Sequence, residues 1–190
     1  MNKIIAFIFL FASFYSAVSA QYTQQITNVR AQARIFADAT IKRDYNTVLK
    51  YTNIEGIPRG KLNTISMTKA LRILQTVDSQ MIRNGMEIKS INFGEVLSIV
   101  KVGFELQCTL AQITETKMQF GRTITNSTLL GISSDNGVSW KFIDATGRDA
   151  REMRRLLPHL SDRVVFANPE NPKLIPEPKS QPIKNTGSKK

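Results

Sequence analysis

Cysteine and histidine are the residue types best suited to nucleophilic or metal chemistry. Each occurs once in the chain, as Cys108 and His159. A nucleophilic thiol needs a basic partner that lowers its pKa, and a structural zinc site needs about four clustered ligands. Cys108 lies instead in an alternating run with Phe104, Leu106 and Leu110, where a thiol acts as a small apolar filler. We therefore expect a buried core thiol, no metal site and no cofactor. A single cysteine also excludes an intrachain disulfide.

A group of arginines near the C-terminus has the chemistry to bind anions. The segment 148–157, which we expect to form a short helix that stops before Pro158, contains Arg148, Arg151, Arg154 and Arg155. Guanidinium groups pair with carboxylates and phosphates through two parallel hydrogen bonds. This pattern predicts an anion-binding face, while an ordinary solvated helix surface remains the open alternative.

Residues 133–140 read Ser-Ser-Asp-Asn-Gly-Val-Ser-Trp and match the Asp-box pattern Ser-x-Asp-x-Gly-x-Ser/Thr-Trp. Its members here are Ser133, Asp135, Gly137 and Trp140. We expect Asp135 to accept backbone hydrogens, Gly137 to supply a positive φ and Trp140 to cover the apolar side of the turn. Sialidase-like propellers repeat the motif once per blade, whereas it occurs once here. We therefore interpret it as a structural turn.

The first twenty residues predict export. Lys3 precedes an almost unbroken apolar run from Ile4 to Phe14, and small residues lead to a signal-peptidase cut between Ala20 and Gln21. This run is shorter than the roughly 20 apolar residues that cross a bilayer. We expect a cleaved signal peptide at 1–20, no transmembrane segment in the mature chain, and a secreted or periplasmic protein.

Without that peptide the chain keeps 25 Lys+Arg against 15 Asp+Glu, because only Lys3 is lost, and its formal net charge becomes +10. Such an excess favours anionic neighbours, such as a surface polymer of the cell envelope. Nucleic acid is the partner that we least expect outside the cytosol. The charge can equally serve solubility alone.

The mature chain is long enough for one domain, which we place at 21–166. Helical spacing predicts a long amphipathic helix over 21–41, a short helix over 45–51, and a third helix that Ser66 opens and Asn84-Gly85 ends. We expect the third helix to bury one stripe, formed by Met67, Ala70, Leu71, Leu74, Val77 and Met81.

From Met86 to Asp144 the apolar residues alternate, which predicts an antiparallel meander with turns at 102–103, 120–121 and 136–137. Its strands exceed the usual ~5 to 6 residues, so we expect strong bending. In the second strand, the apolar set changes parity before Ile113, which predicts a bulge near 111–112. Residues 167–190 are rich in proline and lysine and predict a mobile tail.

The order of these elements resembles the cone-shaped, cystatin-like superfamily of nuclear transport factor and ketosteroid isomerase. The resemblance rests on the Lys-Arg-Asp-Tyr break at 42–45 and the strand Trp-Lys-Phe-Ile-Asp at 140–144, and it covers roughly 21–155. Within that superfamily, 128–144 is similar to secreted bacterial members without an assigned function. One difference is that 53–66 shows no clear hairpin. The resemblance implies an α+β fold with three N-terminal helices on a strongly curved antiparallel sheet, and a homodimer paired through an exposed sheet face.

The resemblance also implies an interior pocket, for which our candidate residues are Tyr45, Glu105 and Trp140. An isomerase-like or dehydratase-like reaction there would need a carboxylate base and hydroxyl donors. Glu105 alternates opposite Leu106 and can equally face solvent, and Asp144 can cap a turn. We therefore name no catalytic residue. We expect a binding module for an anionic surface polymer or a small apolar ligand, with a carboxylate enzyme as the alternative.

Overall fold

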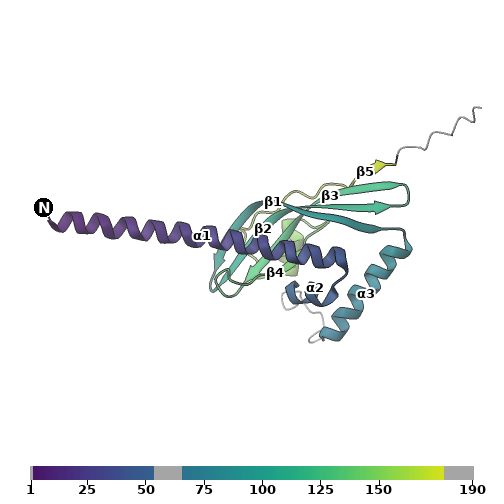
Figure 1. The fold of residues 1–190 in the computed structure, drawn as a ribbon, viewed down its shortest axis with the longest axis horizontal. Helices are drawn as coiled ribbons and strands as arrows, with labels where there is room; N and C mark the ends of the chain where they lie inside the picture. Colours follow the sequence, from purple (N-terminus) through teal and green to yellow (C-terminus); the bar gives the residue numbers. More distant parts are fainter. Residues whose placement is uncertain (1, 54–65, 178–190) are drawn as a thin grey trace, which may run out of the picture.

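A computed structural model describes residues 2–53 and 66–177, with side chains from Gln21 onward. The chain is α+β, with N-terminal helices packed against a curled antiparallel sheet and a short helix after it, which confirms the expected fold class (Figure 1). The segment 54–65, where we expected no hairpin, lies outside the described residues, as does 178–190.

Local capping determines where the helices begin and end. The helix α1 ends where Arg43 adopts a left-handed φ of 59°, and Asp44 then caps α2 by accepting a hydrogen bond from the N–H of Thr47. Ser66 caps α3 in the same way through the N–H of Lys69. The bounds are α1 Asn2–Lys42, α2 Tyr45–Tyr51, α3 Met67–Arg83 and α4 Ala150–Leu156.

Four strands follow one another across the sheet in chain order, and a fifth pairs with the third. They are β1 Glu87–Val102, β2 Glu105–Met118, β3 Gly121–Ser133, β4 Lys141–Asp144 and β5 Lys173–Pro176. The turns lie at the positions that the alternating pattern predicts. The first three strands have 16, 14 and 13 residues, so the expectation of unusually long strands is confirmed.

The bulge that we expected near 111–112 lies on the neighbouring strand. The register between β2 and β3 is unbroken, whereas β1 holds an extra residue between Phe93 and Val96, opposite Ala111. Ile113, which suggested the parity change, is 43% exposed and does not belong to the core face. The sequence pattern therefore predicted the correct position along the strands but assigned the bulge to the wrong strand.

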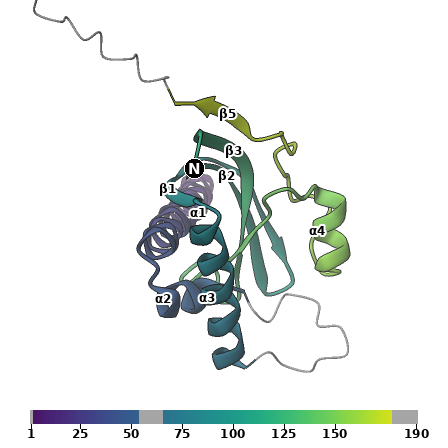
Figure 2. The same ribbon diagram turned by 90° about the vertical axis from the view of Figure 1, so that its right-hand side faces the viewer.

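The sheet is covered on both faces, with α1 on one side and α4 on the other (Figure 2). The core under α1 contains Val29, Ala33, Leu106, Cys108, Leu110, Leu129, Trp140 and Phe142. The core under α4 contains Val100, Leu130, Ile132, Ala145, Met153, Leu157, Leu160 and Val164. Because side chains alternate along a strand, the two faces of the sheet contribute to different cores.

The chain after α4 is held on the sheet by buried polar side chains. Gln107 donates to the carbonyl of His159 at 3.1 Å and accepts from the N–H of Ser161 at 2.9 Å, while Thr109 donates to the carbonyl of Val165. This segment covers part of the face that we expected to be open for pairing. A homodimer through the sheet would have to use the remainder of that face.

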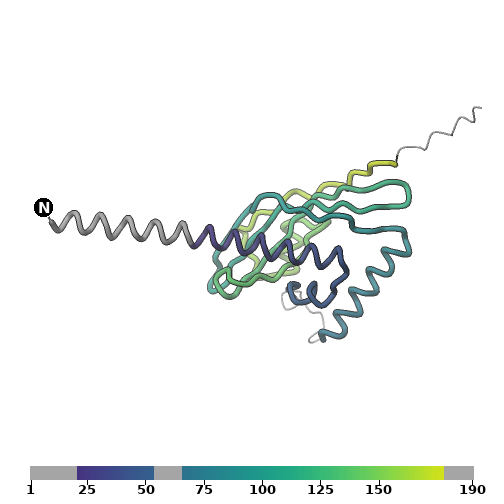
Figure 3. Tube along the Cα trace, in the orientation of Figure 1, coloured from purple at the N-terminus to yellow at the C-terminus, as the bar shows by residue number. Residues whose placement is uncertain are grey.

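The segment that we expected to be a mobile tail from Ala167 packs along the sheet as far as it is described (Figure 3). It forms β5, which pairs antiparallel with Gly121–Ile124 of β3. Gly121 permits this approach, because a Cβ there would lie 2.3 Å from the carbonyl oxygen of Ile175. The composition of this segment did not predict β5, because backbone pairing requires few large apolar side chains.

The stripe that we expected α3 to bury is at most partly covered. No residue of α3 is buried, and Met67 and Val77 are 60% and 49% exposed. The reason is its position, since α3 contacts chiefly α2 instead of lying over the sheet (Figure 1). In the described part of the chain, no helix has the length and apolar character needed to cross a membrane.

Candidate functional site: an arginine face and an Asp-box turn

The Asp-box turn is closed by its own side chains as the sequence predicts. Asp135 accepts hydrogen bonds from the N–H of Ser139 at 2.9 Å and from the hydroxyl of Ser133 at 2.8 Å. Gly137 has a φ of 89°, and its N–H donates to Ser133. Trp140 is 1% exposed and donates through its indole N–H to the carbonyl of Gly137.

The same turn is the surface on which α1 docks. Gln25, Asn28 and Gln32 donate to the carbonyls of residues 136, 137 and 138, respectively. These three amides are three or four residues apart and therefore lie along one face of the helix. The outward carbonyls of the turn are thus occupied by α1, which accounts for the motif without a ligand.

The structure does not bring together Tyr45, Glu105 and Trp140, the candidate pocket residues. The Tyr45 hydroxyl donates to Asp78 of α3 at 2.7 Å, a hydrogen bond that raises the pKa of Tyr45. Trp140 is enclosed in the core under α1. Glu105 has the same parity as Gln107 and so faces the α4 side of β2.

Groups for acid–base or metal chemistry are also separated. Among the described residues no Asp or Glu is buried, and no three His, Cys, Asp or Glu side chains gather as metal ligands. Asp144 accepts from the N–H of Thr146 at 2.7 Å, so it caps a turn. Burial raises the pKa of Cys108 to about 12, which makes it a poor nucleophile.

The four arginines have two different roles. Arg154 is half-buried and donates to the carbonyls of Asp162 and Val164, which ties α4 to the chain that follows it. Arg148, Arg151 and Arg155 are exposed, and none of them takes part in an ion pair between described residues. Arg151 and Arg155 are four residues apart and share one side of α4, and Arg148 directly precedes its N-cap. We call these three exposed residues the arginine face.

The acids of α4 and its cap are engaged elsewhere. Asp149 accepts from the N–H of Glu152 at 2.8 Å, and Glu152 accepts from the N–H of Asp149 at 3.2 Å, which is a reciprocal capping box. Both carboxylates therefore stabilise the start of the helix. The segment 148–155 has four Arg against these two acids, so its formal net charge stays positive.

A hollow of about 320 Å³ lies beside the arginine face, between α4 and residues 166–169. Arg151 and Arg154 contribute to its wall, together with Phe166 and Pro169. The side-chain nitrogen Nε of Arg154 is buried without a hydrogen-bond partner among the described residues. Asp149 also lines the hollow, so its wall has two guanidinium groups and one carboxylate.

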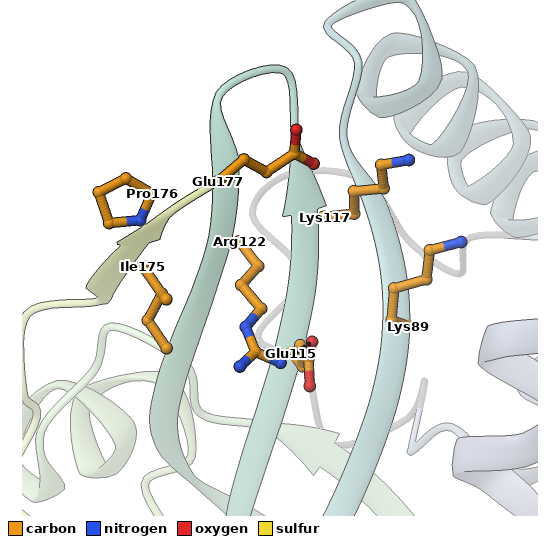
Figure 4. Close-up of a pocket in the computed structure, with 8 residues that line it drawn as sticks. Lys89, Glu115, Lys117, Arg122, Ile175, Pro176 and Glu177 are labelled. Carbon is orange, nitrogen blue, oxygen red and sulfur yellow. Dashed lines mark hydrogen bonds and ion pairs between the residues drawn. The ribbon is translucent and has the colours of Figure 1, made fainter. Parts of the chain in front are cut away.

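A second hollow, of about 500 Å³, lies near the tip of the long hairpins and is walled on one side by β5 (Figure 4). Arg122 points toward Glu115 and pairs with it at 3.0 Å, and Lys89 pairs with Glu87. Because its cations are largely neutralised by neighbouring acids, this hollow selects neither sign of ligand charge. The sequence patterns did not reveal it, since β5 was not expected.

In comparisons with protein-family models, with curated proteins and with solved structures, nothing matched the chain. The resemblance to the nuclear transport factor and ketosteroid isomerase superfamily therefore stays a prediction.

Proposed function

We propose that this chain is an exported, non-catalytic binding module that holds an anionic surface polymer on its arginine face. The observation that carries the proposal is the arrangement of charge at α4. Three exposed arginines lie on the helix or directly before it, and the two acids beside them are committed to the capping box. A surface of unneutralised guanidinium groups recognises carboxylate, phosphate or sulfate groups.

The exposure of these three charges favours a polymer over a single small anion. One exposed ion pair contributes only about 0 to 1 kcal/mol, because water and salt screen it. Several weak contacts made by one chain of repeated charges add through their high effective concentration.

The position of α1 supports export with a cut before Gln21. Residues 21–24 are exposed, and burial begins at Gln25. A cut there would leave every docking contact of α1 with the Asp-box turn in place. The mature domain would thus start one helical turn before its first packed residue.

Salt-dependent retention of the mature chain, residues 21–190, on immobilised heparin tests the proposal. Heparin serves as a model sulfated polysaccharide. We expect retention at low ionic strength and elution as salt rises, because screening weakens exposed charge pairs. The triple variant Arg148→Gln, Arg151→Gln, Arg155→Gln should elute at clearly lower salt.

A matched variant removes the same charge from another helix. Lys69→Gln, Arg72→Gln, Arg83→Gln changes three exposed cations of α3. This control should elute closer to the wild-type position than the arginine-face variant does. Equal effects of the two variants would mean that net charge alone causes retention, and that result would refute a site on α4.

A further inference from the structure

The helix α3 presents an amphipathic surface that the rest of the described chain covers only in part. It runs for 17 residues without one buried side chain, and four of its large apolar residues are exposed. These are Met67, Ile73, Val77 and Ile82, with exposed fractions of 60%, 45%, 49% and 50%. Such a helix in a water-soluble domain marks an interaction surface.

The exposed apolar residues have basic neighbours. Ile73 and Val77 are four residues apart and project from the same flank of α3. Lys69, four residues before Ile73, is exposed on the same side of α3, and Arg72 and Arg83 are exposed on its polar side. Large amphipathicity, low overall hydrophobicity and Lys or Arg on the polar side are typical of helices that lie in the plane of a membrane surface.

The neighbouring helices add to the positive charge. Residues 42–51 and 67–84 carry six Lys or Arg and two Asp. Both acids are engaged, since Asp44 caps α2 and Asp78 accepts from Arg43 at 2.9 Å and from the Tyr45 hydroxyl at 2.7 Å. The end of the molecule formed by α2 and α3 therefore has an uncompensated positive charge beside exposed apolar side chains.

We propose that α3 docks on a membrane surface that contains anionic lipid, with Ile73 and Val77 entering the boundary between headgroups and acyl chains. The basic residues of α3 then contact lipid headgroups and add an electrostatic attraction to the burial of apolar area. A second copy of the chain fits this face less well, because pairing two α3 helices would bring like charges together. This inference concerns a surface other than the arginine face and does not depend on polymer binding.

Sedimentation with vesicles tests the inference on the mature chain. The probes are vesicles of phosphatidylcholine alone and vesicles that also contain phosphatidylglycerol. We expect binding to the anionic vesicles and little binding to the neutral ones. The variant Ile73→Gln, Val77→Gln keeps the net charge and replaces both residues with a good helix former. It should lower the partition coefficient roughly tenfold or more, because apolar area no longer leaves water.

Two further variants serve as controls. Phe104→Gln, Phe120→Gln removes larger apolar side chains, 94% and 80% exposed, from hairpin turns and should bind vesicles like wild type. The arginine-face variant should elute from heparin at lower salt and keep most vesicle binding. Circular dichroism and thermal unfolding verify that each variant is folded.

The inference is overturned if wild type does not bind anionic vesicles, or if the Ile73 and Val77 variant binds them as tightly as wild type. It is also overturned if sedimentation equilibrium shows a dimer that this variant dissolves, because the partner is then a second copy. Loss of vesicle binding in the arginine-face variant alone would assign the lipid contact to α4 and contradict a role for α3.

Discussion

The side-chain oxygen Oε1 of Gln32 accepts a hydrogen bond from the backbone N–H of Trp140 at 2.9 Å, across 108 residues of sequence. The amide nitrogen of Gln32 at the same time donates to the carbonyl of Val138. Both ends of one side-chain amide thus hold α1 to the Asp-box turn. The motif in this chain is the platform that positions the first helix over the sheet.

Gly137→Ala should destabilise the fold by about 1 to 3 kcal/mol. Alanine is strained at a φ of 89°, and its Cβ would lie 2.6 Å from Cγ of Gln25. Gly103→Ala is the matched control, because Gly103 also has a positive φ, of 58°, but nothing lies within 4 Å of the point that a Cβ would occupy there. Urea unfolding should therefore show a larger loss at Gly137 than at Gly103. Equal losses would contradict a close contact between α1 and the turn.

Adding Gln25→Ala to Gly137→Ala should restore part of the lost stability. The second substitution removes the overlap at Cγ and leaves the backbone strain. The two changes should therefore be non-additive by about 0.5 kcal/mol or more in a double-mutant cycle. Strict additivity would show that the two residues are energetically independent.

Gln107→Leu should lower the free energy of unfolding by about 2 kcal/mol or more. Gln107 is fully buried and hydrogen-bonds the carbonyl of His159 and the N–H of Ser161, which leucine leaves without partners. Gln75→Leu on the exposed side of α3 is the control and should change stability little. Chemical denaturation measures both, and a neutral effect at Gln107 would mean that the segment after α4 does not depend on this anchor.

Cys108 should resist thiol reagents in the folded protein. It has no exposed surface, and burial raises its pKa to about 12, so almost no thiolate forms near neutral pH. A chromogenic disulfide reagent should react with one thiol only after denaturant is added. Rapid reaction of the native protein would contradict a closed core under α1.

Acid should weaken the Asp-box turn through Asp135. Burial raises the pKa of this carboxyl, but hydrogen bonds from Ser139 and Ser133 outweigh burial and hold the pKa below its ordinary value of 3.8. A folded-state pKa below the unfolded one means that the stabilisation is present above about pH 4 and is lost as pH falls through the folded pKa. The difference in unfolding free energy between wild type and Asp135→Asn should therefore shrink as the pH is lowered from neutral to below about 4. A constant difference would refute the stabilising role of the ionised carboxylate.

Local sequence signals predicted the helix caps and turns, which depend on residues close together in the chain. Ser66 and Asn84 bound α3 as expected, and the Asn136-Gly137 turn has two positive φ angles, because caps and turns depend on the chemistry of a few neighbouring positions. The Asp-box hydrogen bonds were foreseen for the same reason. Their use by α1 was not, since Gln25 and Gln32 look like ordinary polar residues of a helix.

Long-range placement was beyond the sequence patterns. The apolar spacing of α3 was correct, but spacing does not show whether another element covers the stripe. The strand β5 was missed because its pairing uses backbone groups, and Gly121 reads as a turn residue unless the partner is known. The residues of the candidate pocket do not lie together for a similar reason. Tyr45 and Trp140 belong to elements whose relative position depends on the whole fold.

The arginine face is tested most directly by amide chemical-shift mapping of the isotope-labelled mature chain during titration with a short heparin oligosaccharide. The account predicts shifts concentrated at Arg148, Arg151 and Arg155 and along α4, and their reversal on addition of salt. Shifts concentrated in the hollow walled by β5, or an absence of shifts at low ionic strength, would contradict it.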